Sequence, residues 1–154
     1  RGFTKIGAMG LSLGGSVAIM TAAKDSTGSG LNAIVSESAF ANIDLMGHQF
    51  YRNFFILKYP LTFLTKLWAN ILLRVDISSS PEKAAASIKI PVLLIHSKKD
   101  ATIPFENARR LEQALKNNSK AEFFFHEEDT HGSLPGHLQT EYEKRVIEFF
   151  KQNL

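Results

Sequence analysis

The sequence contains no cysteine, so disulfide bonds, thiolate metal sites and a cysteine nucleophile are all excluded. It also lacks an uninterrupted membrane span, because charged residues and a proline break its most apolar stretch, 53–73. Basic residues are scattered: 18 Lys and Arg against 15 Asp and Glu leave a net charge of +3. The clustered basic stripe that nucleic-acid binding requires is missing. We therefore expect no membrane span and no nucleic-acid partner.

The length and composition favour one globular domain. The 154 residues are 44% hydrophobic and 21% charged, which is close to the averages of folded domains. The chain shows no internal repeat and no low-complexity segment. We expect a single domain over residues 1–154, built around one hydrophobic core.

Short apolar runs alternate with helical patterns along most of the chain. Strands are predicted at 4–9, 31–36, 91–96 and 121–126, and helices at 16–24, 60–73, 81–87, 105–116 and 140–152. The strands are continuously apolar, a pattern typical of parallel strands covered by helices on both faces. The sequence therefore predicts an α/β fold with a parallel sheet of about four strands flanked by helices.

Residues 42–80 differ in character from the rest of the chain. Aromatic residues gather between Phe50 and Trp68, Pro60 fits a first helical position, and apolar residues then recur at helical spacing. We interpret this segment as a helical insertion. Its aromatic side chains either form a small core of their own or wall an apolar substrate pocket over Ser12. Contact with membranes or lipid aggregates is a third interpretation.

The segment Gly10-Leu11-Ser12-Leu13-Gly14 matches the G-x-S-x-G motif and lies between a predicted strand and a predicted helix. That context is the one in which a sharp turn exposes a strained nucleophilic serine at a helix N-terminus. The motif predicts Ser12 as a nucleophile. The backbone N–H of Leu13 is then a candidate oxyanion-hole donor.

A serine nucleophile needs a base, and the base needs an acid that fixes its tautomer. Asp100 follows the strand predicted at 91–96, and His131 follows the strand predicted at 121–126. Both lie at the expected carboxyl edge of the sheet, where ligands bind in open α/β folds. Glu37 is an alternative acid and His137 an alternative base.

Three other histidines carry weaker expectations. His96 is expected to be buried and to hydrogen-bond the loop around Asp100, and His48 to lie on the surface or on a pocket wall. The run 126–131 is not expected to bind metal, because its histidines are five residues apart and follow a strand rather than lying on a helix. We expect no metal and no cofactor.

These residues together resemble the α/β-hydrolase superfamily, and specifically its serine hydrolases of the esterase or prolyl-oligopeptidase-like type. The similar segments are 6–15, 90–104 and 130–132, which with their spacing span nearly the whole chain. The resemblance implies Ser12 as nucleophile, Asp100 as acid and His131 as base, with 42–80 in the position of the family's cap. One departure is Ser97, since a glycine usually follows the histidine before the acid loop.

A larger departure is the position of the strand that leads into the Gly10–Gly14 turn, called the elbow in this family; here that strand begins at residue 4. The resemblance therefore implies that the chain is the C-terminal half of a catalytic domain, forming a partial α/β-hydrolase fold. The loop that supplies the second oxyanion-hole N–H in the family would lie outside it. The strand predicted at 4–9 would be an exposed edge, open to self-association.

The expected function is hydrolysis of a small-molecule ester or related acyl substrate through an acyl-enzyme. The same residues would serve a serine peptidase or acylaminoacyl peptidase equally well. An alternative of another class is a non-catalytic fragment or interaction module. The sequence identifies neither the substrate nor the cellular compartment.

Overall fold

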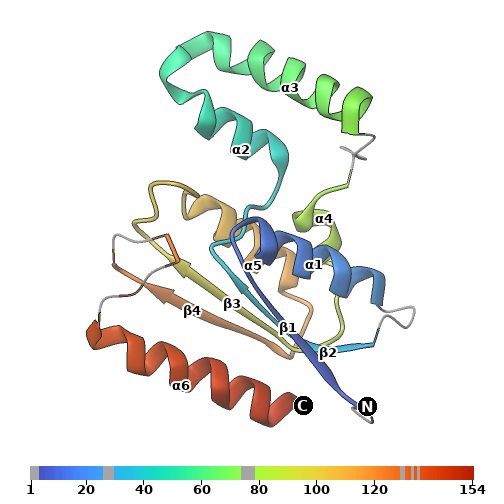
Figure 1. Cartoon of the computed structure of the whole chain (residues 1–154), viewed down its shortest axis with the longest axis vertical. Coiled ribbons are helices and arrows are strands. Elements are labelled where there is room, and N and C mark those ends of the chain that lie inside the picture. The colour runs from blue at the N-terminus through green and yellow to red at the C-terminus, as the bar shows by residue number, and fades with distance from the viewer. Residues whose placement is uncertain (1–3, 26–29, 74–78, 129–130, 133, 135) are drawn as a thin grey trace.

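The computed structural model describes residues 4–25, 30–73, 79–128, 131–132, 134 and 136–154. Its strands are β1 (Ile6–Leu11), β2 (Leu31–Glu37), β3 (Val92–Ser97) and β4 (Ala121–His126). They form one sheet in the order β1-β2-β3-β4, and every neighbouring pair is parallel (Figure 1). The predicted parallel sheet is confirmed.

Helices cover both faces of this sheet. One face carries α1 (Leu13–Asp25), α4 (Pro81–Ala85) and α5 (Glu106–Leu115), and the other carries α6 (Gly136–Asn153) (Figure 1). As the sequence predicts, Pro81 opens α4, behind an N-cap serine whose hydroxyl accepts from the Lys83 N–H. No helix within the described residues combines the length and the hydropathy that crossing a bilayer requires.

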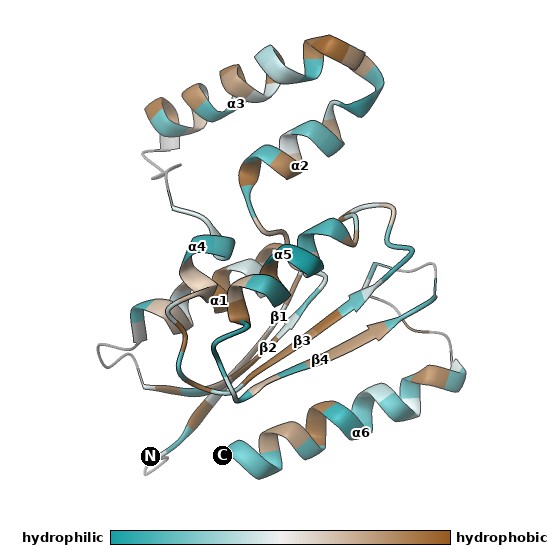
Figure 2. Cartoon of the chain, turned by 180° about the vertical axis from the view of Figure 1, so that it is seen from behind, coloured by the Kyte–Doolittle hydropathy of each residue, from teal (hydrophilic) through white to brown (hydrophobic). Residues whose placement is uncertain are grey.

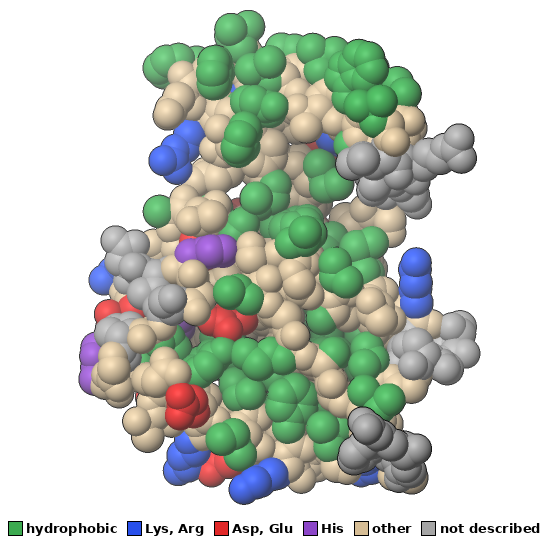
Figure 3. Space-filling model, in the orientation of Figure 1, with side chains coloured by type: hydrophobic (Ala, Val, Ile, Leu, Met, Phe, Trp, Pro, Cys, Tyr) green, Lys and Arg blue, Asp and Glu red, His purple; other side chains and the backbone are tan. Residues whose placement is uncertain are grey.

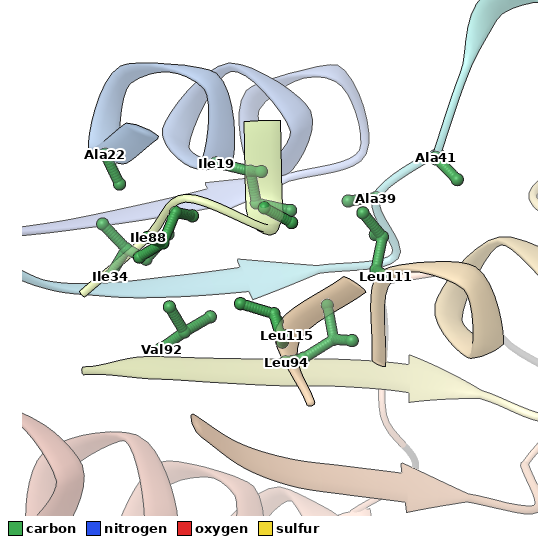
Figure 4. Packing of buried hydrophobic residues seen from close by; sticks show 11 residues of the cluster. Ile19, Ala22, Ile34, Ala39, Ala41, Ile88, Val92, Leu94, Leu111 and Leu115 are labelled. Carbon is green, nitrogen blue, oxygen red and sulfur yellow. The ribbon is translucent and has the colours of Figure 1, made fainter. Parts of the chain in front are cut away.

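Alternate residues of the central strands divide the core into two layers. Ile34 and Leu94 point toward α1, α4 and α5, where they pack with Ile19, Leu111 and their neighbours (Figure 4). Val35 and Leu93 point the other way and pack with Phe149 of α6. Because both faces are buried, these strands have no polar face, which explains their continuous hydrophobicity.

Several element boundaries differ from the predicted ones. β1 was expected at 4–9 but extends to Leu11, because Gly10 and Leu11 still pair with Ser36 and Glu37 of β2. α1 begins directly after the elbow rather than at residue 16, since Gly14 and its neighbouring glycine are part of its first turn. α6 begins at residue 136 rather than 140.

The segment after β2 forms a hairpin that projects beyond the carboxyl end of that strand (Figure 1). It consists of α2 (Ile43–Phe50), the 3-10 helix η1 (Arg52–Leu57) and α3 (Lys58–Leu73). Asp44 of α2 and Lys66 of α3 form a 2.7 Å ion pair that joins the two arms. Pro60 is the third residue of α3 rather than the first, which costs no hydrogen bond because first-turn N–H groups have no helical partner.

The interpretation of this insertion as a small core of its own is wrong. Neither α2 nor η1 contains a buried side chain. Most large apolar side chains of α3 are exposed as well, and hydrophobic side chains gather on the part of the surface formed by the hairpin (Figure 3). Two arms alone cannot enclose the apolar side chains that helical periodicity places on them, so these side chains face outward.

Candidate active site

The turn between β1 and α1 holds Ser12 in a strained backbone conformation. Its φ of +56° lies in the left-handed region that residues with a side chain rarely adopt. The Ser12 N–H donates a 2.8 Å hydrogen bond to the carbonyl of Glu37 at the end of β2. The Ser12 carbonyl accepts a 3.1 Å bond from the Ser16 N–H in α1. The strained turn predicted from the motif is therefore present and is anchored on both sides.

The glycines at this turn contribute unequally. A Cβ on Gly10 would lie 2.2 Å from the carbonyl carbon of Gly14, so no side chain fits there. A Cβ on Gly15 would come within 3.0 Å of the carbonyl oxygens of Glu37 and Gly10. Gly14 itself has nothing within 4 Å of its Cβ position. The close approach of strand and helix thus depends on Gly10 and Gly15.

Leu13 is the first residue of α1. The N–H groups of a helix's first turn have no carbonyl partner within the helix, and they carry its positive dipole end. The Leu13 N–H therefore has no partner within the helix and lies at the positive end of α1, directly after Ser12.

Asp100 and His131 form a direct pair at the carboxyl edge of the sheet. Asp100 lies in the loop after β3 and is only 5% exposed. One of its carboxylate oxygens, Oδ2, lies 2.7 Å from Nδ1 of His131. The other, Oδ1, accepts 2.8 Å hydrogen bonds from the backbone N–H groups of Thr102 and Ile103. Because Nδ1 donates to the carboxylate, Nε2 of His131 is left to accept a proton.

The loop that carries His131 packs against the elbow. A Cβ on Gly132, whose φ is +77°, would lie 2.5 Å from Cδ1 of Leu11. The residue that follows the histidine is thus in contact with the residue that precedes Ser12. This contact joins the loop of His131 to the turn of Ser12, although no hydrogen bond between the Ser12 hydroxyl and the His131 ring occurs among the described residues. Thr130, which belongs to the predicted motif, lies outside the described residues.

His96 stabilises the loop that presents Asp100, as the sequence predicts. Its side chain is fully buried, and Nε2 donates a 2.8 Å hydrogen bond to the carbonyl of Ile103. Burial lowers the pKa of His96, more than the nearby Asp100 carboxylate raises it. A neutral imidazole with its proton on Nε2 therefore holds the acid loop against β3.

Ser97 has a structural role that the sequence analysis missed. Its buried hydroxyl donates to the carbonyl of Glu128, in the loop leading to His131, and accepts a 3.0 Å bond from the Lys99 N–H. The side chain thus connects the acid loop to the base loop. A glycine, which the resemblance predicts here, could not make either bond. The sequence did carry a signal for this role, because a serine at position 97, where the resemblance predicts glycine, adds a hydroxyl between two loops.

Neither the alternative acid Glu37 nor the alternative base His137 is hydrogen-bonded to this pair in the described part of the chain. The carboxylate of Glu37 accepts a 2.6 Å hydrogen bond from the hydroxyl of Tyr142, and burial raises its pKa despite that bond and the nearby His131. The side chain of His137 is mostly exposed, with Nε2 3.5 Å from a carboxylate oxygen of Glu128. Among the described residues, the carboxylate that hydrogen-bonds His131 is that of Asp100.

The remaining histidines do not assemble a metal site. Within the part of the chain that the structure describes, no three His, Asp or Glu side chains are grouped so that they could bind an ion. His48 of α2 instead contacts the ring of Tyr59 edge to face, with 4.9 Å between ring centroids.

A groove lies between α2 and α3, and its lining residues all belong to the hairpin. Its volume is about 470 Å³, which is within the range of small-molecule sites. It is lined by Ile43, Met46, Gly47, Phe50, Tyr51, Thr62, Thr65 and Lys66. The side chain of Gln49, on the same helix α2, donates a 2.8 Å hydrogen bond to the carbonyl of Ala101. The hairpin is thereby attached to the loop that carries Asp100.

Solved structures share this fold. An esterase from Pyrococcus furiosus matches with a TM-score of 0.71 and 22% identity, over 97% of this chain and 54% of its own. An acylaminoacyl peptidase from Pyrococcus horikoshii matches with a TM-score of 0.73 and 22% identity, over 98% of this chain and 24% of its own. An alpha/beta fold family hydrolase from Bacillus anthracis matches with a TM-score of 0.62 and 17% identity, over 99% of this chain and 68% of its own. The chain therefore spans about half the length of the esterase and has the architecture of an α/β hydrolase.

A search of curated proteins finds no match to this chain. The model of the prolyl oligopeptidase family, in contrast, matches residues 3–154. That range includes the turn of Ser12 and the loops that carry Asp100 and His131. The chain belongs to the prolyl oligopeptidase family.

Proposed function

We propose that the protein hydrolyses an ester or related acyl substrate through a covalent acyl-enzyme formed on Ser12. The observation that carries this proposal is the 2.7 Å pair of Asp100 and His131, combined with the packing of Gly132 on Leu11 beside the strained serine. A nucleophile, a base and an acid that orients the base are the parts that acyl transfer needs.

In the proposed mechanism, Oγ of Ser12 attacks the acyl carbon while its proton passes to Nε2 of His131. Asp100 holds the imidazole in the required tautomer and stabilises the imidazolium that forms. The Leu13 N–H donates to the oxyanion. His131 then returns the proton to the departing alcohol, and a water molecule, deprotonated by the same histidine, hydrolyses the acyl-enzyme and restores Ser12.

The groove in the hairpin supports a proposal for the substrate class. Because the apolar side chains of Ile43, Met46 and Phe50 of α2 line one wall of it, we propose that residues 42–80 form a cap whose groove receives an apolar acyl chain. The shared fold of the esterase supports this assignment.

A peptidase is the second candidate, favoured by the family and by the fold shared with an acylaminoacyl peptidase. The same three residues could cleave an amide. Comparing matched ester and anilide substrates of one acyl group separates the two candidates, because a peptidase turns over the anilide at a rate comparable to the ester.

Labelling with a fluorophosphonate, read by intact mass, tests the nucleophile. We expect one label per chain, abolished in Ser12→Ala and His131→Ala. Matched controls are Ser119→Ala and His137→Ala, which change an exposed serine and the alternative histidine and should label normally. A folded chain without label, or with label that survives Ser12→Ala, would overturn the proposed function and favour a non-catalytic module.

We further propose that the edge strand β1 mediates self-association. Within the described sheet it pairs only with β2, and Ile6, Met9 and Leu11 are about half exposed. Sedimentation equilibrium should show a dimer that Met9→Lys weakens. A monomer at all concentrations would contradict this proposal.

A further inference from the structure

The turn between α2 and α3 presents an apolar tip to solvent. Phe54, Phe55, Ile56 and Leu57 are consecutive in η1, and all of them are more than half exposed. Figure 2 shows this corner of the hairpin as apolar. Phe55 is 84% exposed and also has a φ of +46°, which is an outlier for a bulky side chain. Strain of this kind persists at sites that serve a function.

The apolar side chains of the tip do not form one helical face. The backbone of Phe55 is not helical and kinks η1, so these four consecutive side chains, all more than half exposed, do not follow the periodicity of one helix. A protein groove would cover such a tip on some sides only. A fluid hydrocarbon phase can cover every side at once.

Basic residues flank this tip on both sides in the sequence. Arg52 is exposed, and Lys58 lies 5.2 Å from the ring centroid of Tyr59. Neither forms an ion pair with any described residue. The acidic residue of the hairpin, Asp44, is neutralised by Lys66 at 2.7 Å. The charge near the tip is therefore positive.

We propose that this tip, residues 52–58, docks on an anionic lipid surface. The apolar side chains of η1 enter the acyl region, and Arg52 and Lys58 reach the headgroup phosphates. The C-terminal turn of α2, which leads directly into the tip, is attached by Gln49 to the loop of Asp100. Docking would thus hold the candidate active site close to the lipid surface, although the proposal does not depend on catalysis.

Flotation of the full chain with vesicles tests the surface. We expect it to bind vesicles of phosphatidylcholine mixed with phosphatidylglycerol, and to bind pure phosphatidylcholine weakly. The double variant Arg52→Gln/Lys58→Gln should weaken binding to the mixed vesicles on the order of 30-fold, since each basic residue near such a surface contributes a similar factor. The matched control, Lys144→Gln/Lys151→Gln, removes two exposed charges of α6 and should bind like the wild type.

Two further variants test the apolar part. Phe55→Ser should lose binding, whereas Ile147→Ser, which changes an exposed apolar residue of α6, should keep it. In Phe55→Trp/Trp68→Phe, the single tryptophan should shift its emission to the blue when mixed vesicles are added. The proposal is overturned if the wild type fails to float with the mixed vesicles, or if Phe55→Ser binds them as well as the wild type does. It is also overturned if Phe55→Ser abolishes a dimer of the chain while vesicles leave the wild type unbound.

Discussion

Replacing Asp100 with Asn isolates the role of one carboxylate oxygen. The Asn side chain has almost the same shape, and its amide oxygen can keep both 2.8 Å bonds from the N–H groups of Thr102 and Ile103. The amide NH₂ would then occupy the position of Oδ2, 2.7 Å from Nδ1 of His131. Two donors cannot face each other, so Nδ1 must become the acceptor and the proton moves to Nε2.

In that tautomer His131 cannot take the proton of Ser12, and no carboxylate stabilises an imidazolium. Losing the acid of a serine triad while its geometry is kept costs on the order of 10⁴-fold in turnover, which corresponds to about 5.5 kcal/mol of transition-state free energy. The fold should change little, because the two loop hydrogen bonds and the packing remain.

The assay is kcat/KM for an aryl ester, with the melting temperature as a control for folding. Glu37→Gln is the matched comparison, since it neutralises the alternative acid and leaves an oxygen that can accept from Tyr142. We expect it to change kcat/KM less than about threefold. If Asp100→Asn keeps more than a tenth of the activity while Glu37→Gln loses it, Glu37 is the acid and our assignment is wrong.

Three further predictions concern the stability of the fold, the dependence of that stability on pH, and the length of the substrate's acyl chain. Gly10→Ala should destabilise the fold by about 1–3 kcal/mol, because its Cβ would lie 2.2 Å from the Gly14 backbone, whereas Gly14→Ala should be nearly neutral in thermal melts. The unfolding free energy should fall as pH drops below 6.5, by up to about 1.4 kcal/mol per pH unit, because burial lowers the pKa of His96 and the unfolded chain takes up a proton that the folded chain excludes. Urea titrations above and below that pH check the slope, which His96→Gln should reduce; equal slopes would refute the argument. Met46→Trp should lower kcat/KM for octanoyl esters about tenfold and leave kcat/KM for acetyl esters unchanged. Leu72→Trp, which lies outside the groove, should change neither value. An equal loss of kcat/KM for both esters in Met46→Trp would count against the groove as the acyl site.

Local features of the chain could be predicted from the sequence. The continuous apolar strands indicated a parallel sheet, because only strands buried on both faces lack a polar side. The strained turn at Ser12 followed from glycines between a strand and a helix. The buried His96 followed from its place at a strand end. Element boundaries were less accurate, since β1 continues for as long as β2 offers partners, to Leu11.

What the sequence alone determined is the type of the strands and of the helices that cover the sheet, together with the set of residues able to carry the chemistry. Only the tertiary structure decided which of them meet: Asp100 rather than Glu37 hydrogen-bonds His131, and Ser97 connects the two loops. Helical periodicity likewise predicted apolar side chains on the hairpin, but it did not predict whether other residues would cover them. The physical reason is that propensity and spacing act over a few residues. Pairing across 31 residues, as between Asp100 and His131, depends on how neighbouring strands bring distant loops to one edge.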